Sequence, residues 1–217
     1  MRVTVNVNAP DETSSCQAAI LDDVFNQLGP NIQLGFNIYK KDFDFSFLFD
    51  FIKRYYMSKV IRIGLAQPIV DMQNTYLPIE QYRSVGKRIT KLAESAFKRN
   101  IRVSFDCGFV PCMFFKEDLA RLEAVSSDLR FVCSPIIDIN PDLIAWHCFP
   151  LSEMHNVCRK GFSSLKALYD HFEHQFFPYT SVGIYNYCPS CDWFIQKKCT
   201  GGCIAHKILN QRLTPLQ

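Results

Sequence analysis

Apolar and polar residues alternate with two different periods in the first part of the chain. Residues 2–8 (RVTVNVN) alternate valine with polar residues, which is typical of a β-strand. From about residue 14 to Leu28 the apolar positions recur every three to four residues, as in an amphipathic helix. Thr13 or Ser14 is a suitable N-cap for this helix, and the Gly-Pro-Asn sequence at 29–31 ends it.

The same order of elements repeats up to about residue 109. Further strands are predicted at 32–39, 60–66 and 101–109, and further helices at 45–57 and 79–99. A β-α-β-α-β-α-β order indicates parallel strands joined by crossover helices, so the predicted fold class is α/β. Four such strands make half of a barrel or a small open sheet. Because a half barrel leaves two sheet edges unpaired, we expect it to stay open, to dimerise or to lack its beginning.

The character of the chain changes after residue 110. Residues 131–217 hold seven of the ten cysteines, show weak periodicity and contain one predicted helix, at 163–177. A small, loop-rich region of this kind rarely stabilises itself by core burial alone, so metal ligation would have a structural role in it. We therefore predict two domains, over residues 1–128 and 129–217, the second being a small α+β domain.

Composition and charge indicate which classes of protein and of partner the chain fits. The 217 residues are 48% hydrophobic and 21% charged and include nineteen phenylalanines, which is typical of a globular protein. The net charge of +3 is dispersed along the chain, which argues against a nucleic-acid partner. The sequence has no apolar run of eighteen residues and no signal peptide, so we expect a cytoplasmic protein without a membrane partner. Thiols stay reduced in that compartment, and ten cysteines then favour metal ligation.

The densest cysteine motif lies near the end of the chain. Residues 188–203 read CPSCDWFIQKKCTGGC, a C-x2-C-x7-C-x3-C array. The C-x2-C pair brings two thiolates to one metal centre, and Gly201 and Gly202 let the backbone bend closely before Cys203. An all-thiolate zinc site and an iron–sulfur cluster both suit this array, and two disulfides are the alternative.

Two further cysteine motifs lie upstream of the array. The predicted fourth strand ends in FDCGFVPC (105–112), and fourteen residues separate Cys133 from Cys148, which closes INPDLIAWHC. In this order the motifs resemble the C-terminal two-thirds of a radical SAM enzyme carrying a SPASM domain. The resemblance implies that the predicted strands are the third to sixth of a partial (β/α)6 barrel and that a hairpin carries Cys133 and Cys148.

The resemblance also implies two auxiliary [4Fe-4S] clusters and their ligands. The first would be held by Cys133, Cys148 and Cys203, with Cys107 or Cys112 as the fourth ligand. The second would be held by Cys188, Cys191 and Cys199, with a fourth position that is open or filled by water, His206 or another chain. Zinc at Cys188, Cys191, Cys199 and Cys203 is the competing assignment, and it would leave the upstream cysteines unused.

The chain departs from the family at several points. It has no C-x3-C-x2-C motif for the cluster that binds S-adenosylmethionine, and no Gly-Gly-Glu segment. Leu143 stands where the family usually has glycine, the array has seven residues between its middle cysteines where five is commoner, and no cysteine follows Cys203. We therefore expect this chain to be the auxiliary-cluster half of such an enzyme, without its N-terminal strands. We do not expect the chain to cleave S-adenosylmethionine alone.

The family suggests the partners and some further site residues. Asn37, Gln67 and Asp106 lie near the ends of predicted strands, where they are candidates to contact substrate or the ribose of S-adenosylmethionine, with turn capping as the alternative. The expected substrate is a peptide or protein, and a radical-generating chain is an expected partner. A zinc-stabilised binding module and a split subunit are the rival functions. Cys16 and Cys158 are expected to be buried core thiols.

Overall fold

The computed structural model describes residues 2–126, 128–134 and 136–213 and divides the chain into two compact units. The first, which we call the sheet unit, comprises Met1–Ala66, Leu77–Asp106 and Cys112–Arg130. The second, the cysteine-rich unit, comprises Gln67–Tyr76, Cys107–Pro111 and Phe131–Gln217. The predicted two-domain division differs in that it placed residues 67–76 and 107–111 in the first domain.

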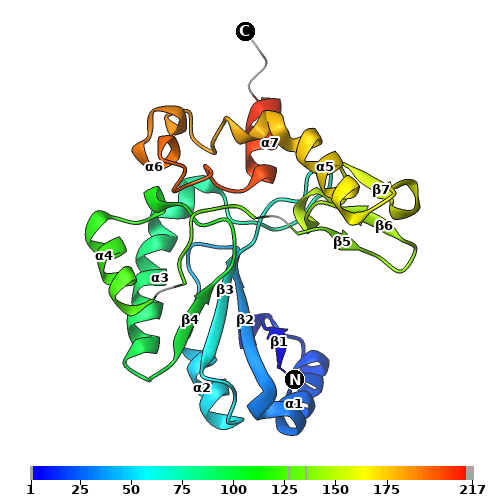
Figure 1. Cartoon of the computed structure of the whole chain (residues 1–217). Helices are drawn as coiled ribbons and strands as arrows, with labels where there is room; N and C mark the ends of the chain where they lie inside the picture. The colour runs from blue at the N-terminus through cyan, green and yellow to red at the C-terminus, as the bar shows by residue number, and fades with distance from the viewer. Residues whose placement is uncertain (1, 127, 135, 214–217) are drawn as a thin grey trace. The chain divides into compact units, whose positions relative to one another are not determined.

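The sheet unit is α/β, as predicted. Its four strands are all parallel and lie in the order β1-β2-β3-β4 (Figure 1). Its elements, in chain order, are β1 (Val3–Asn6), α1 (Ser15–Leu28), β2 (Ile32–Ile38), α2 (Ser46–Arg54), β3 (Val60–Leu65), α3 (Tyr82–Phe97), β4 (Arg102–Phe105) and α4 (Lys116–Val125). Each predicted strand and helix of this part is present, whereas α4 was not predicted.

Local sequence explains how the first two helices begin. Ser14 and Gln17 form a capping box: the Ser14 hydroxyl accepts from the Gln17 N–H, and the Gln17 side chain accepts from the Ser14 N–H. Ahead of α2, the Asp44 carboxylate accepts hydrogen bonds from the N–H groups of Phe45 and Ser46. Both arrangements satisfy backbone donors that a helix leaves without an intrahelical partner.

The two faces of the sheet differ in polarity. The strands follow one another in a single direction, and right-handed crossovers then put α1, α2 and α3 on one face. On that face β2 buries Ile32, Leu34, Phe36 and Ile38, and the Phe36 ring packs 5.7 Å from Phe47 of α2. The phenylalanine-rich segment at 43–51 thus contributes much of its length to the core. The opposite face carries the polar side chains Asn6, Asn37, Arg62 and Asp106.

The cysteine-rich unit combines a small antiparallel sheet with short helices. Its elements are β5 (Asp138–Ile139), β6 (Ile144–Trp146), β7 (Asn156–Cys158), α5 (Leu165–Phe176), α6 (Asp192–Ile195) and α7 (Ile204–Leu213). Its core brings together residues from the sheet, α5, α7 and the loop after β3, namely Val70, Ala145, Leu151, Leu168, Phe172, Phe176, Cys203, Ala205 and Ile208. The predicted helix at 163–177 corresponds to α5.

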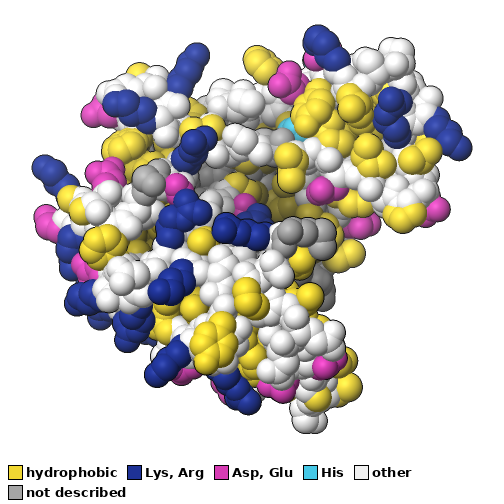
Figure 2. Space-filling view, turned by 60° about the horizontal axis from the view of Figure 1, so that its bottom comes forward, with side chains coloured by type: hydrophobic (Ala, Val, Ile, Leu, Met, Phe, Trp, Pro, Cys, Tyr) yellow, Lys and Arg dark blue, Asp and Glu magenta, His cyan; other side chains and the backbone are white. Residues whose placement is uncertain are grey.

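Of the helices that the structure describes, none is long and apolar enough to cross a bilayer. On the face drawn in Figure 2, Lys and Arg side chains occupy several separate places among acidic and apolar ones.

A glycine in α3 tests the packing of the sheet unit. A Cβ atom on Gly86 would lie 2.2 Å from the Met113 carbonyl oxygen, so we expect Gly86→Ala to lower the free energy of unfolding by about 1–3 kcal/mol. Helix propensity alone favours alanine by about 1 kcal/mol, so the opposite sign would contradict this packing. Gly161 is the control, because no atom lies within 4 Å of its added Cβ. Denaturant unfolding of both variants measures the difference.

Candidate metal centre

Four cysteines from separate segments gather in the cysteine-rich unit, and we call them the first thiol group. They are Cys107, two residues after β4; Cys133, before β5; Cys148, two residues after β6; and Cys203, directly before α7. All three others lie within electrostatic reach of Cys148, since the thiols of Cys203, Cys133 and Cys107 all raise its pKa. The pKa of Cys203 is raised in turn by Cys133 and Cys107. Tertiary structure thus assembles sulfur donors that span almost a hundred residues of sequence.

Burial is the main influence on three of these thiols, whereas Cys107 is exposed. Burial raises the pKa of Cys203 to about 12, and it raises those of Cys133 and Cys148 above the ordinary thiol value. Neighbouring thiols oppose ionisation further, because each new thiolate would repel the next. Cys133, Cys148 and Cys203 become thiolates together only when a cation compensates their charge, and a bound metal supplies such a cation.

The N-terminus of α7 is directed at two of these sulfurs. The backbone N–H of Ile204 donates to the Cys133 sulfur, and those of Ala205 and His206 donate to the Cys203 sulfur. Helix N-termini carry a partial positive charge and N–H groups without intrahelical partners, so they stabilise thiolates. The helix therefore favours the metal-binding form of both cysteines.

Three cysteines of the array form a second thiol group: Cys188, Cys191 and Cys199. The pKa of Cys199 is raised by burial and then by Cys188 and Cys191, which shows that the three sulfurs lie near one another. The Gly201 N–H donates to the Cys199 sulfur over 3.2 Å. Gly201 and Gly202 have φ values of 75° and 87°, which few residues other than glycine adopt. These glycines provide the close bend that the sequence predicted.

The cysteines of the two thiol groups are not arranged as the ligands of a single metal ion. Among the described residues, no three or more His, Cys, Asp or Glu side chains are grouped closely enough to hold one metal ion. All ten cysteines lie in that part of the chain and none forms a disulfide. A cubane differs from a single ion because each of its thiolates binds a different iron, so its ligands stand farther apart.

The other candidate residues have varied positions. Asn37 and Asp106 lie together on the polar face of the sheet, where both are close to Gly64, and Asp106 accepts a 2.6 Å hydrogen bond from Arg62. Gln67 belongs to the cysteine-rich unit, where its side chain lies close to Gly108. Cys112 belongs to the sheet unit.

Two of the remaining cysteines are not core thiols. Cys16 and Cys158 are exposed, contrary to the prediction. Cys16 stands in the first turn of α1 on its outer side, and Cys158 ends the edge strand β7.

Sequence reasoning missed Lys207. The side chain lies in α7 and the residue is only 2% exposed. Its ammonium donates to the carbonyl oxygens of Thr200 at 2.6 Å and Tyr179 at 3.1 Å. The available signal was a lysine within the IAHKIL segment, whose other residues are apolar apart from His206, one helical turn after a cysteine.

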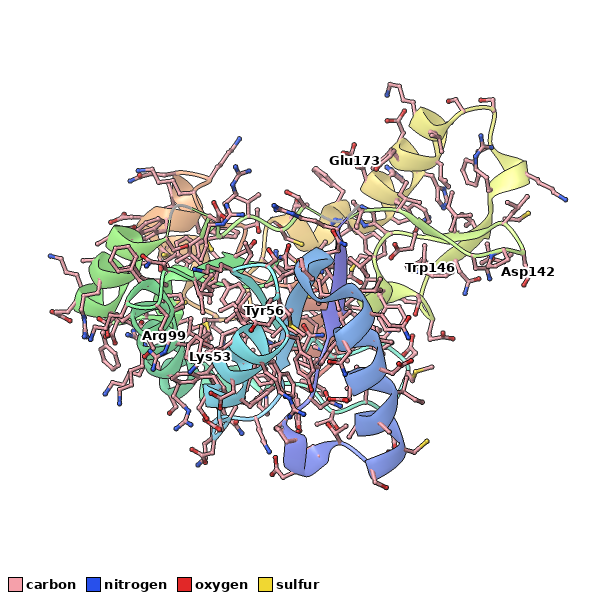
Figure 3. The ribbon with its side chains drawn as sticks, turned by 90° about the horizontal axis from the view of Figure 1, so that it is seen from below. Lys53, Tyr56, Arg99, Asp142, Trp146 and Glu173 are labelled. Atoms are coloured by element: carbon pink, nitrogen blue, oxygen red, sulfur yellow. The ribbon has the colours of Figure 1, made fainter. Side chains whose placement is uncertain are left out.

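A cavity of about 540 Å³ opens beside the first thiol group. Cys133, Lys207 and buried His147 line it, together with Glu173 of α5 (Figure 3) and several aromatic rings. His147 stacks between Phe172 and Phe176, with ring centroids 5.6 and 5.1 Å away, and burial lowers its pKa. The cavity therefore joins an apolar wall to the edge of the thiol group.

The sheet unit has a separate cavity of about 600 Å³, lined by Lys53, Tyr56 and Arg99 among others (Figure 3). It lies near the residues that precede β3 and β4, which is the N-terminal end of the parallel strands. Functional side chains of parallel α/β folds gather at the C-terminal end, so we assign this cavity no part in the metal centre.

Comparisons with protein-family models, with curated proteins and with solved structures found no match to this chain. The functional argument therefore depends on the arrangement of its own residues.

Leu143 provides a test of the hairpin that precedes Cys148. Its φ is 63°, in the left-handed region that costs a residue with a Cβ atom about 1–2 kcal/mol. We expect Leu143→Gly to be more stable than Leu143→Ala by about 1 kcal/mol in denaturant unfolding. The comparison removes the leucine side chain from both variants. At an ordinary turn or strand position alanine would be the more stable, so that order would contradict the left-handed backbone.

The buried imidazole of His206 predicts acid sensitivity. Burial lowers its pKa from 6.5 to about 4. Between those pH values the unfolded imidazole binds a proton that the folded one does not, so stability falls as the pH falls. The shift corresponds to roughly 3 kcal/mol. We expect the free energy of unfolding of the metal-free wild type to fall more steeply between pH 7 and pH 4 than that of metal-free His206→Gln. Parallel pH dependences of the two proteins would contradict this prediction.

Proposed function

We propose that this chain is the auxiliary-cluster part of a radical SAM/SPASM-type protein. The sheet unit corresponds to the later strands of a partial (β/α)6 barrel, and the cysteine-rich unit to a SPASM-like domain. One or two auxiliary [4Fe-4S] clusters serve electron transfer or substrate binding during radical modification of a peptide or protein.

The convergence of the first thiol group is the observation that carries this proposal. Cys133, Cys148 and Cys203 are the ligands that the resemblance implies for one cluster, and they come from three distant segments. Cys107 is within electrostatic reach of Cys148 and Cys203 and lies in the same unit, whereas Cys112 belongs to the sheet unit, so we take Cys107 as the fourth ligand. A zinc site made from the array alone does not explain why Cys203 is coupled to these upstream cysteines.

Two features of the fold add support. The strands run in sequential order and one direction, an arrangement that suits a segment of a barrel. Leu143 keeps a left-handed backbone at the position where the family usually has glycine. A left-handed backbone at this position is what a glycine would adopt readily, so it is compatible with the hairpin geometry of the family.

The residues present suit iron–sulfur ligation. Cysteine thiolates are the usual ligands of such clusters, which exchange single electrons when bound, and N–H donors to the sulfurs adjust the reduction potential. Ile204, Ala205 and His206 would supply those donors to the first group, and Gly201 to the second. Cys188, Cys191 and Cys199 would leave a fourth position of the second cluster open to a substrate atom or another ligand.

The proposed activity requires a partner. We do not expect the chain to cleave S-adenosylmethionine alone, because its sequence has no C-x3-C-x2-C motif. A radical-generating chain or an N-terminal half would supply that step, with Asn37 and Asp106 on the polar sheet face as candidates to contact the cofactor or substrate. The exposed and half-buried thiols suit a reducing compartment such as the cytoplasm.

Metal analysis tests the proposal. Protein purified without oxygen is expected to contain about four or eight irons per chain with matching acid-labile sulfide. Cys107→Ala should lose the iron of one cluster, about four atoms, whereas Cys112→Ala should retain it.

Cys16→Ala is the control, because Cys16 is an exposed thiol outside both groups. About one zinc per chain without sulfide would contradict the proposal and favour a zinc-stabilised binding module. Iron loss from Cys112→Ala with retention in Cys107→Ala would reverse the assignment of the fourth ligand.

A further inference from the structure

Lys207 is a buried cation in an unusual environment. Lysine is almost never fully buried unless its charge is paired. Among the described residues no carboxylate forms a salt bridge with Lys207, and its two recorded acceptors are the neutral carbonyls of Thr200 and Tyr179. Two carbonyl bonds use two of the three ammonium donors but provide no counter-charge.

Cysteines of both thiol groups lie near this charge and would compensate it once they are thiolates. Burial lowers the pKa of Lys207, and Cys133, Cys203, Cys199 and Cys188 raise it. Two of these cysteines belong to the first group and two to the second. Lys207 therefore lies within electrostatic reach of both.

Hydrogen bonds tie Lys207 to the segments that carry those cysteines. Thr200 follows Cys199 in the chain, and its carbonyl accepts from Lys207. The Thr200 hydroxyl accepts from the Cys133 N–H at 2.7 Å, and the Thr200 N–H donates to Phe131 at 3.0 Å. Thr200 thus joins a ligand segment of each thiol group, and the Lys207 ammonium is bonded to its carbonyl.

Helix geometry fixes the side chain in this place. Lys207 stands four residues after Cys203, so the two lie on the same side of α7, and the Lys207 N–H donates to the Cys203 carbonyl. The first turn of that helix already directs its N–H groups at the sulfurs of Cys133 and Cys203. The ammonium adds a full charge one turn further along.

We propose that Lys207 is a positioning residue whose fixed positive charge stabilises the anionic iron–sulfur groups at both thiol groups. The inference rests on the proposed function, because a cluster held by thiolates supplies the negative charge that the buried ammonium lacks. A single side chain then influences both centres.

The proposal predicts opposite effects on the metal-free and the loaded protein. Without metal, Lys207 is a buried charge without a carboxylate, and replacing it with methionine of similar volume removes a desolvation cost. Metal-free Lys207→Met should therefore be more resistant to denaturant than the wild type. In the loaded protein the same change removes a counter-charge, so the clusters become harder to reduce and easier to lose.

The experiment compares wild type, Lys207→Met, Lys207→Arg and Lys198→Met after anaerobic reconstitution with iron and sulfide. Reduction potentials come from redox titration, and cluster stability from the rate of iron transfer to a chelator. For Lys207→Met we expect potentials shifted to more negative values and iron release faster by on the order of tenfold. Lys207→Arg keeps the charge and should stay close to the wild type in potential.

Lys198 is the matched control, because it directly precedes Cys199 yet is exposed, where water screens its charge. A Lys207→Met shift no larger than that of Lys198→Met would overturn the role of Lys207 while leaving the clusters established. If metal-free Lys207→Met is less resistant to denaturant than the metal-free wild type, the role of Lys207 is also overturned. This measurement does not require the variant to take up iron and sulfide. A wild type that takes up no iron or sulfide would instead refute the proposed function and this inference with it.

Discussion

Burial of several thiols in one small unit is the constraint on which the cysteine-rich half of the molecule depends. The sulfurs of Cys133, Cys148 and Cys203 are withdrawn from water, and each opposes the ionisation of the others. The hydrophobic core around Phe172 and Phe176 is modest, and Cys203 is itself part of it. Metal ligation by these thiols would therefore add directly to the stability of the unit. It would replace mutual repulsion of the thiolates by bonds to a shared metal centre.

Helix α7 links this constraint to function. Its preceding residue is Cys203, its first N–H groups point at two sulfurs, and its second turn brings Lys207 into the same interior. Backbone dipoles and one ammonium thus supply positive potential from a rigid element. A loop would hold such groups less exactly in place, because its side chains and backbone have more freedom.

The sheet unit follows simpler rules. Its strands and helices were predictable from periodicity, and in β2 the alternation corresponds to a buried face that includes Ile32, Leu34 and Phe36. Helix α4, in which Asp118 and Leu122 are the buried residues, was not predicted. The exposed Cys16 was likewise misjudged, since a helical stripe defines one buried side and Cys16 lies off it.

The sequence alone determined the parallel α/β order, the domain in which the cysteines concentrate, and the glycine bend before Cys203, because these depend on residue type and local spacing. Tertiary structure alone decided which cysteines lie near one another, that Cys107 lies within electrostatic reach of Cys148 and Cys203, and that Lys207 is buried near cysteines of both groups. Such contacts join segments far apart in the chain, and no local period encodes them. The left-handed backbone at Leu143 also became visible only in the structure, because leucine itself does not favour that conformation.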